Sequence, residues 1–485
     1  MTEIKHRWIP GPLRVVPCLV LLSCAIARGE DKLWVGWASI SITPDRPVAL
    51  EGQLYTRVSK YVHDPVTATA LTLETRDGGR IQDQAILVSC DLVFIEAGLQ
   101  DGVRAQLDGK LPGFDLKKLF LHATHTHTGP LMNDSWYRVP KQGVMQAPEY
   151  LSWLIERLSK VVIQSWNARQ PGGVSWGRGY AVVGHNRRPV YANGQAKMYG
   201  PADSPDFDHI ETGEDPVVEL LYFWNAQAKL TGVLINIACP SQLVEHESYI
   251  SADFWNDARA QIRARHSADL FVYPMVGAAG DQSPHLIYGQ KAEELVRRAH
   301  GTSEGEEIGR RIADAVDSAL PGASRDIRFD APLRHLVESV ALPYHPITRQ
   351  QAEEGRKFYE NEVREGKSDP MLGLLHKDIA DRYDKLAANI QFRPEIHVLR
   401  LGDVALASNP FELYLDYGTR IKARSAAVET FIAQLACEYG SYLPTARAIE
   451  AGGYSAELWS FRVGPSGGKI LVDRTVELIQ SLWDK

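Results

Sequence analysis

The stretch Leu119-Phe120-Leu121-His122-Ala123-Thr124-His125-Thr126-His127-Thr128-Gly129-Pro130 joins an apolar run to two closely spaced histidines. The apolar residues predict a buried strand, and the residues after them predict a loop at the end of that strand. Residues i and i+2 of an extended segment point to the same side, so His125 and His127 can direct two imidazoles into one cleft. Neutral imidazole is a common ligand for zinc and similar metals, although two structural histidines would fit the same pattern.

A second loop with candidate functional residues follows the apolar run from Leu270 to Val276. Its sequence is Gly277-Ala278-Ala279-Gly280-Asp281-Gln282-Ser283-Pro284, and small residues of this kind allow a sharp turn with backbone amides facing a ligand. Ser283 would then lie on a tight loop at a strand end, where α/β proteins place much of their chemistry. A plain glycine-rich turn, capped by Asp281, is the alternative.

Strand and helix patterns alternate along the chain. Residues 217–224, 230–237, 396–401 and 404–407 have the apolar character of strands, and the last two predict a hairpin that ends just before Glu412. Helices are predicted from residue 148 to residue 162 and over residues 254–266, 306–320, 348–365, 370–388 and 469–483. This alternation predicts an α/β fold with a central mixed β-sheet flanked by helices, in one hydrolase domain over residues 32–485.

Five segments together resemble the neutral/alkaline, non-lysosomal ceramidases, a family of secreted or surface zinc amidases that cleave N-acylsphingosine. The segments occur in that family's order and are Thr124–Pro130, Asn186–Pro189, Gly280–Pro284, Pro410–Glu412 and Gly440–Tyr454. The segment Gly36–Pro44 also looks like the start of the family. The resemblance implies the ceramidase fold, and we expect it without the family's immunoglobulin-like C-terminal domain, because the chain ends about thirty residues beyond Tyr454.

The resemblance also implies a zinc site and a set of residues around it. Three positions match the family's zinc ligands: His125, Glu412 and Tyr442. Three others match its active-site and substrate-contacting residues: Arg187, Ser283 and Tyr454. His127 lies two residues beyond the first ligand, where it can move a proton to the leaving amine. These residues form the predicted catalytic site.

The family's second zinc histidine is missing from this sequence. In the family it lies in an Ala-x-His segment after a hydrophobic strand, and here the strand 233–237 leads into Ala238-Cys239-Pro240-Ser241-Gln242. We predict that Cys239 replaces it, because thiolate binds zinc well. Ligation by His246, or no second ligand and a buried structural role for Cys239, are the alternatives. A thiolate would make the metal a poorer Lewis acid than imidazole does, which favours easier substrates or higher pH.

Composition limits the class of protein. The 485 residues are 44% hydrophobic and 23% charged, as in an ordinary soluble protein. The net charge of -7, without a block of lysine or arginine, argues against nucleic-acid binding.

The N-terminus has the pattern of a signal peptide. Basic residues at positions 5, 7 and 14 precede a mostly apolar run over 15–26, and Ala25-Ile26-Ala27 fits a cleavage site. Residues 1–27 are therefore predicted to be a signal peptide of a secreted, periplasmic or cell-surface protein. The segment Leu21-Leu22-Ser23-Cys24 also resembles a bacterial lipobox, and lipidation at Cys24 would tether the protein to a membrane.

These features predict a secreted, zinc-dependent amidohydrolase with one Zn²⁺ per chain. Its expected substrate is a small lipid-like or N-acyl compound, such as ceramide or another N-acyl amine. Two alternatives stay open: a serine hydrolase that uses Ser283 with His127 or His285 as base, and a non-catalytic binding protein on the same scaffold, which the missing histidine favours.

Overall fold

The computed structural model describes residues 32–365 and 370–484. The predicted signal peptide, residues 1–27, and the lipobox cysteine Cys24 lie outside the described residues.

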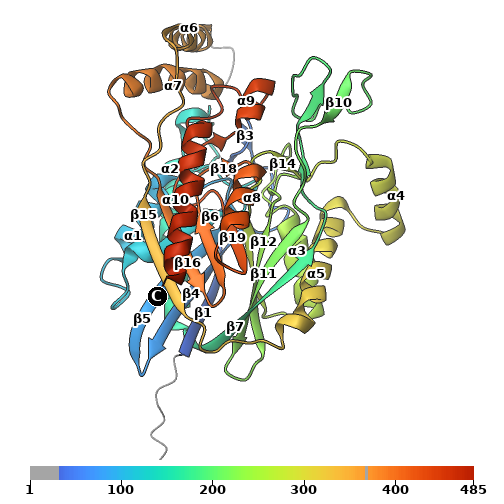
Figure 1. Cartoon of the computed structure of the whole chain (residues 1–485). Helices are drawn as coiled ribbons and strands as arrows, with labels where there is room; N and C mark the ends of the chain where they lie inside the picture. The colour runs from blue at the N-terminus through green and yellow to red at the C-terminus, as the bar shows by residue number, and fades with distance from the viewer. Residues whose placement is uncertain (1–31, 366–369, 485) are drawn as a thin grey trace, which may run out of the picture.

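A mixed eight-stranded sheet forms the centre of the molecule (Figure 1). In spatial order its strands are β13 (Phe271–Val276), β12 (Leu230–Ile237), β11 (Val217–Asn225), β7 (Gln170–Tyr180), β1 (Lys32–Ser41), β4 (Thr67–Asp77), β5 (Arg80–Cys90) and β6 (Leu119–Ala123). The outermost pairs, β12–β13 and β5–β6, are parallel, and the pairs between them are antiparallel.

The two edges of this sheet come together, which brings the two loops singled out in the sequence to one place. Ser89 Oγ on β5 donates a hydrogen bond to the carbonyl of Pro274 on β13 (2.7 Å). The His122 ring on β6 and the Tyr273 hydroxyl on β13 are also hydrogen-bonded, at 2.9 Å. The sheet therefore curls, and the loops that follow β6 and β13 lie at the same end of it.

A second sheet covers one face of the first. Its strands are β15 (Leu333–Ser339), β16 (Glu395–Leu401), β17 (Val404–Ser408) and β19 (Glu429–Ala433), in that order. Leucine, phenylalanine and valine side chains from both sheets share one buried cluster. The predicted 396–407 hairpin is confirmed as β16–β17, but the sequence did not predict that it belongs to a sheet of its own.

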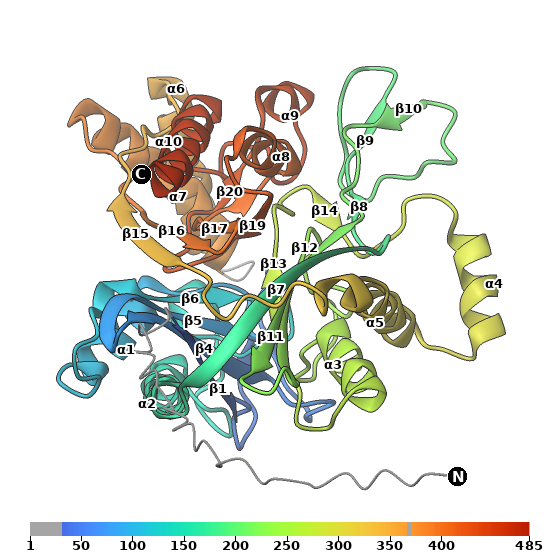
Figure 2. The ribbon, with the colours of Figure 1, turned by 60° about the horizontal axis from the view of Figure 1, so that its bottom comes forward.

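Helices cover the outer faces of both sheets, which gives four layers (Figure 2). On the large sheet lie α1 (Ala97–Leu107), α2 (Ala147–Asn167), α3 (Phe254–Arg265) and α5 (Glu304–Ala323), and on the small sheet lie α8 (Leu415–Arg424) and α10 (Pro465–Trp483). Further helices at the periphery are α4 (Gln290–His300), α6 (Arg349–Glu365), α7 (Pro370–Ala387) and α9 (Ala446–Ala451). The predicted central mixed sheet flanked by helices is confirmed.

Four short strand pairs complete the described structure, and two of them join the sequence motifs. The pairs are β2 (Ala49–Leu50) with β3 (Arg57–Val58), β9 (Pro189–Tyr191) with β10 (Phe207–Ile210), β8 (His185–Asn186) with β14 (Gln282–Ser283), and β18 (Glu412–Leu413) with β20 (Tyr442–Leu443). Within residues 32–365 and 370–484, no helix is long and apolar enough to cross a membrane.

Candidate metal centre and active site

His125 is fixed where the chain leaves β6. Its backbone has a φ of 67°, a left-handed conformation that is uncommon for a residue with a side chain. Its Nδ1 lies 2.7 Å from the carbonyl oxygen of Val93, which can only accept a hydrogen bond. Nδ1 therefore carries the proton, and Nε2 faces the opposite way, into a cavity that His125 lines.

Glu412 and Tyr442 are directly opposite each other in the parallel β18–β20 pair. Gly280 braces this pair, because its amide donates to the carbonyl of Leu413 (2.8 Å). A Cβ at Gly280 would collide with the main-chain carbonyl of Glu412, so the glycine allows the close approach. The glycine-rich loop after β13 thus supports a predicted ligand.

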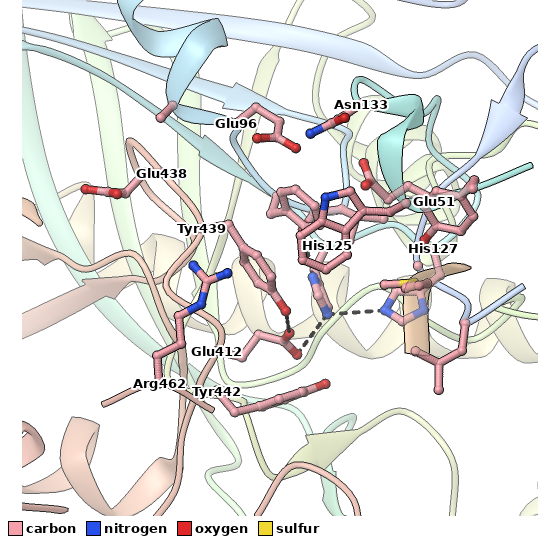
Figure 3. A pocket seen from close by; sticks show the side chains of 18 of the residues that line it. Glu51, Glu96, His125, His127, Asn133, Glu412, Glu438, Tyr439, Tyr442 and Arg462 are labelled. Carbon is pink, nitrogen blue, oxygen red and sulfur yellow. Dashed lines mark hydrogen bonds and ion pairs between the residues drawn. The ribbon is translucent and has the colours of Figure 1, made fainter. Parts of the chain in front are cut away.

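Polar atoms of three elements converge at the floor of the cavity (Figure 3). His125 Nε2 lies 3.3 Å from Glu412 Oε2 and 3.2 Å from His127 Nε2. The Tyr439 hydroxyl donates to Glu412 Oε1 at 2.9 Å. Burial acts to raise the pKa of Glu412, but His125 and a hydrogen bond from Tyr442 outweigh it and hold the pKa below its ordinary value.

Arg187 connects this floor to the second predicted tyrosine. Its Nη2 donates to the Tyr442 hydroxyl (3.1 Å) and to the carbonyl of Gly280 (3.0 Å). The guanidinium carbon lies 5.6 Å and 5.8 Å from the ring centres of Tyr442 and Tyr454, which are in edge contact with each other. The structure thus brings Arg187, Tyr442 and Tyr454 together beside Glu412, although they are far apart in sequence.

The cavity above these groups has a volume of about 270 Å³. Its predicted site residues are His125, His127, Glu412, Tyr442 and Tyr454. The remainder of the wall combines aromatic rings with carboxylates and one arginine, and includes Phe94, Trp136, Tyr137, Tyr439, Glu51, Glu96, Glu438 and Arg462. Such a chamber can hold an organic substrate against the polar floor.

His127 has a carboxylate behind it. Glu245 Oε2 lies 3.6 Å from His127 Nδ1, and Glu245 Oε1 lies 3.6 Å from His285 Nε2. Burial, with the nearby charges of His125 and Arg57, holds the pKa of His127 well below its usual range, so its ring is neutral. The carboxylate is placed to stabilise a positive charge if His127 takes up a proton.

Ser283 is buried beneath the site and is bonded to a tyrosine. Its Oγ lies 2.9 Å from the Tyr199 hydroxyl and accepts a hydrogen bond from the amide of His285 (3.1 Å). The His285 ring is instead directed at the carbonyl of Gln242 (3.0 Å). Because no imidazole is bonded to the Ser283 hydroxyl in the described structure, the arrangement lacks the base that a serine nucleophile needs.

The structure does not bring Cys239 to the metal floor. Its thiol donates to the carbonyl of Val183 (3.2 Å) and lies in an apolar cluster with Phe254 and Trp255. Burial raises the pKa of this thiol well above its ordinary value, which disfavours the thiolate that zinc requires. The alternative ligand His246 has a side chain that is 73% exposed, and it is not part of the cavity wall.

The residues at the floor fit a metal ion. His125 Nε2 has no proton in the neutral ring, yet it faces a carboxylate oxygen of Glu412, whereas the neighbouring His127 Nε2 can donate a hydrogen bond to it. Acceptor atoms at such distances repel one another unless a proton or a metal ion lies between them. The 3.3 Å between His125 Nε2 and Glu412 Oε2 also matches the roughly 3.3 Å between neighbouring ligand atoms of tetrahedral zinc.

A second group of potential ligands lies apart from this floor and was not predicted. Ligand atoms of Glu395, His397 and Cys437 are all within 4.8 Å of one another, close enough to hold a metal ion. Glu395 is already paired with Arg104 (2.6 and 3.2 Å) and with His397 Nε2 (2.8 Å). The Glu395 carboxylate therefore already has hydrogen-bond donors and needs no metal ion. At the cavity floor, in contrast, His125 Nε2 and Glu412 Oε2 are two acceptors that face each other.

Several residues of the site escaped the sequence analysis. Tyr439 has a weak signal, since it precedes Tyr442 by three residues, and Glu245 lies next to the considered His246. Glu51, Glu96 and Tyr199 come from segments without a recognisable pattern, and only the fold brings them to the site.

The chain is similar to known proteins in sequence and in fold. No protein-family model matches the chain. Over 226 residues, 45% of this chain, it is 25% identical to the neutral ceramidase of Pseudomonas aeruginosa, and the matched part spans 32% of that protein's length. The fold is similar to the crystal structure of neutral ceramidase from Pseudomonas aeruginosa (TM-score 0.67) and to a ceramidase complexed with C2 (TM-score 0.68). Each pair is 18% identical and covers 93% of this chain and 75% of the other. The predicted resemblance is confirmed: this chain is related in sequence to the neutral ceramidases and has their fold.

Proposed function

We propose that the protein is a zinc-dependent amidohydrolase that cleaves an N-acyl amide bond. The single observation that carries this proposal is the convergence of His125 Nε2 on Glu412, with the tautomer of His125 fixed by Val93. Sequence similarity to a neutral ceramidase and the common fold support the same class of reaction.

The metal would be held by His125, Glu412 and Tyr442. The hydroxyl of Tyr442 donates a hydrogen bond to Glu412 and receives one from Arg187. Burial and the charge of Glu412 raise the pKa of Tyr442 well above its ordinary value, with Arg187 acting in the opposite direction, so Tyr442 would hold the metal as the neutral phenol unless the ion itself displaces the proton. Cys239 is excluded from this proposed set, because its thiol is occupied in the core. When bound, Zn²⁺ supplies Lewis acidity that polarises an acyl carbonyl and makes water more acidic.

The chain's own residues would orient the substrate and move protons. Tyr454 lines the cavity and would donate a hydrogen bond to the oxygen that gains negative charge in the transition state, while Arg187, in contact with the Tyr442 hydroxyl and the Tyr454 ring, would add positive charge beside it. His127 is neutral and can accept a proton from the attacking water and deliver it to the leaving amine. Glu245 would stabilise the imidazolium formed between these two steps.

Release of a primary amine from N-acyl amines tests the proposal. We expect turnover that a chelator abolishes and zinc restores, and that Glu412→Gln lowers by at least about 100-fold. Tyr439→Phe should weaken zinc binding by about 10- to 100-fold, because it removes the hydrogen bond that orients Glu412. Amide turnover that survives chelation would overturn the proposal.

Ser283→Ala separates this mechanism from the serine alternative. A serine nucleophile would lose nearly all activity in this variant, whereas a residue that only orients Tyr199 should cost about tenfold or less. Binding of a substrate analogue without turnover, with zinc present, would instead support the binding-protein alternative.

We also propose that residues 1–27 are a signal peptide that directs the protein out of the cytoplasm, for the sequence reasons given above. N-terminal sequencing of the mature protein would find a new terminus near residue 28. A lipid-modified Cys24 at the new terminus would support membrane tethering instead, and an intact Met1 would contradict export with cleavage.

A further inference from the structure

The cavity wall opposite the metal floor is acidic. Glu51 and Glu96 lie on this wall, and the rest of the cavity lining adds Glu438 and a single guanidinium, that of Arg462. In Figure 3 the carboxylates of Glu51 and Glu96 lie on the other side of the chamber from Glu412 and Tyr442. The metal does not need these groups, and the proposed reaction does not use them.

Glu51 is the most telling of these residues. It is only 5% exposed, and its Oε2 has no hydrogen-bond partner among the described residues. The neighbouring Arg57 does not compensate it, because Arg57 donates to the main-chain carbonyls of Glu51 and His127. Burial of a carboxylate oxygen without a hydrogen-bond partner is unfavourable in free energy, so this atom is expected to interact with a bound ligand.

The surroundings of Glu51 favour a positively charged ligand. Glu96 is close enough to raise the pKa of Glu51, in addition to the larger effect of burial, and Glu96 is itself hydrogen-bonded to Asn133. Aromatic rings complete the wall, among them Trp136 and the stacked pair Phe94 and Tyr439, whose ring centres are 4.2 Å apart. Carboxylates and aromatic faces together are the usual surroundings of a bound ammonium group.

We propose that Glu51 and Glu96 bind a protonated amino group of the substrate, so that the preferred substrate is an N-acyl derivative of a diamine or of another amine with a second, cationic nitrogen. This inference rests on the proposed function for the position of the amide, which would lie at the metal floor. The amine part of the substrate, which leaves when the amide is cleaved, would then lie against Glu51 and Glu96. A neutral lipid amide would leave the unpaired Glu51 oxygen without a partner.

This inference can be tested by the binding of two substrate analogues that the enzyme cannot cleave. N-(4-aminobutyl)methanesulfonamide carries an ammonium group, N-pentylmethanesulfonamide has a methyl group in its place, and neither is an amide that the enzyme can cleave. Titration calorimetry on the zinc-loaded protein should show at least about tenfold tighter binding of the cationic compound. Binding should also release protons, because a cation favours the ionised form of Glu51.

Variants locate the effect. In Glu51→Gln the ratio of the two dissociation constants should fall to about one, because the carboxylate that binds the ammonium group is gone. In Glu96→Gln this ratio should also decrease, but less completely. Unchanged binding of the neutral compound would show that the cavity is intact in these variants. Glu156→Gln removes one carboxylate from the exposed surface, and it should keep the full preference.

Two results would overturn the proposal. Equal affinity of the two compounds for the zinc-loaded wild-type protein would exclude an ammonium site. Glu51-dependent binding of calcium chloride, without any preference for the ammonium compound, would assign the wall to an inorganic cation. Amide turnover tests the reaction separately, so its failure would leave these binding results interpretable.

Discussion

The buried ion pair between Asp91 and Arg259 should be essential for the stability of the His125 loop. Asp91 is fully buried and accepts five hydrogen bonds: two from Arg259 at 2.8 and 2.9 Å, two from Thr67, and one from the hydroxyl of Thr124. Thr124 immediately precedes His125, so this carboxylate ties the loop to β4 and α3.

Asp91→Asn would keep the shape of the side chain but leave only one acceptor oxygen. Whichever oxygen becomes an amino group would then face two or three donors, and the Arg259 charge would be buried without compensation. Breaking such a pair costs about 3–5 kcal/mol. We expect a loss of this size in the free energy of unfolding measured by urea denaturation at neutral pH.

A double-mutant cycle gives the decisive control. Arg259→Met should also be strongly destabilising, but Asp91→Asn/Arg259→Met should lose less than the sum of the single losses, because no uncompensated charge remains. Additive losses, or a loss below about 1 kcal/mol for Asp91→Asn, would show that the pair does not hold the loop as described.

Two further predictions concern the site loops and the second sheet. Gly280→Ala should displace the main chain of Glu412, since the added methyl group would meet backbone atoms, and should lower zinc affinity measured by competition with a chromogenic chelator; unchanged affinity would contradict the bracing role of Gly280. Glu395, whose pKa is lowered to about 2 because His397 and Arg104 outweigh its burial, should contribute about 1–2 kcal/mol after solvent screening. That contribution is present above pH about 4.5 and is lost as the pH falls toward 2, so Glu395→Gln should have a flatter stability profile over this range than the wild type, and parallel profiles would refute the assignment.

The sequence predicted the fold where the signal is local. The run before His125 is a fully buried strand, and the predicted helices and the 396–407 hairpin are present with ends shifted by a few residues. Helix α5 runs to Ala323, past the predicted end at residue 320, although Pro321 has no amide hydrogen to donate to the carbonyl four residues earlier. The second sheet was not predicted, since its strands look the same in sequence whether they extend the large sheet or pack on it.

The candidate site was predicted where family motifs carry it. The predicted residues that line the cavity all lie in such motifs: His125, His127, Glu412, Tyr442 and Tyr454. The direction of the Cys239 side chain could not be obtained from sequence, because it depends on how the chain turns after β12. The pairing of Glu51 with Glu96 was equally hidden, since only the folded chain brings these two segments to one cavity.

Metal content tests the central claim most directly. Elemental mass spectrometry should find about one zinc per chain in the purified protein and in Cys239→Ser, and much less in Glu412→Gln, with all three proteins folded by circular dichroism. Loss of zinc from Cys239→Ser, or no zinc in the wild-type protein after incubation with the metal, would contradict a centre built on His125, Glu412 and Tyr442.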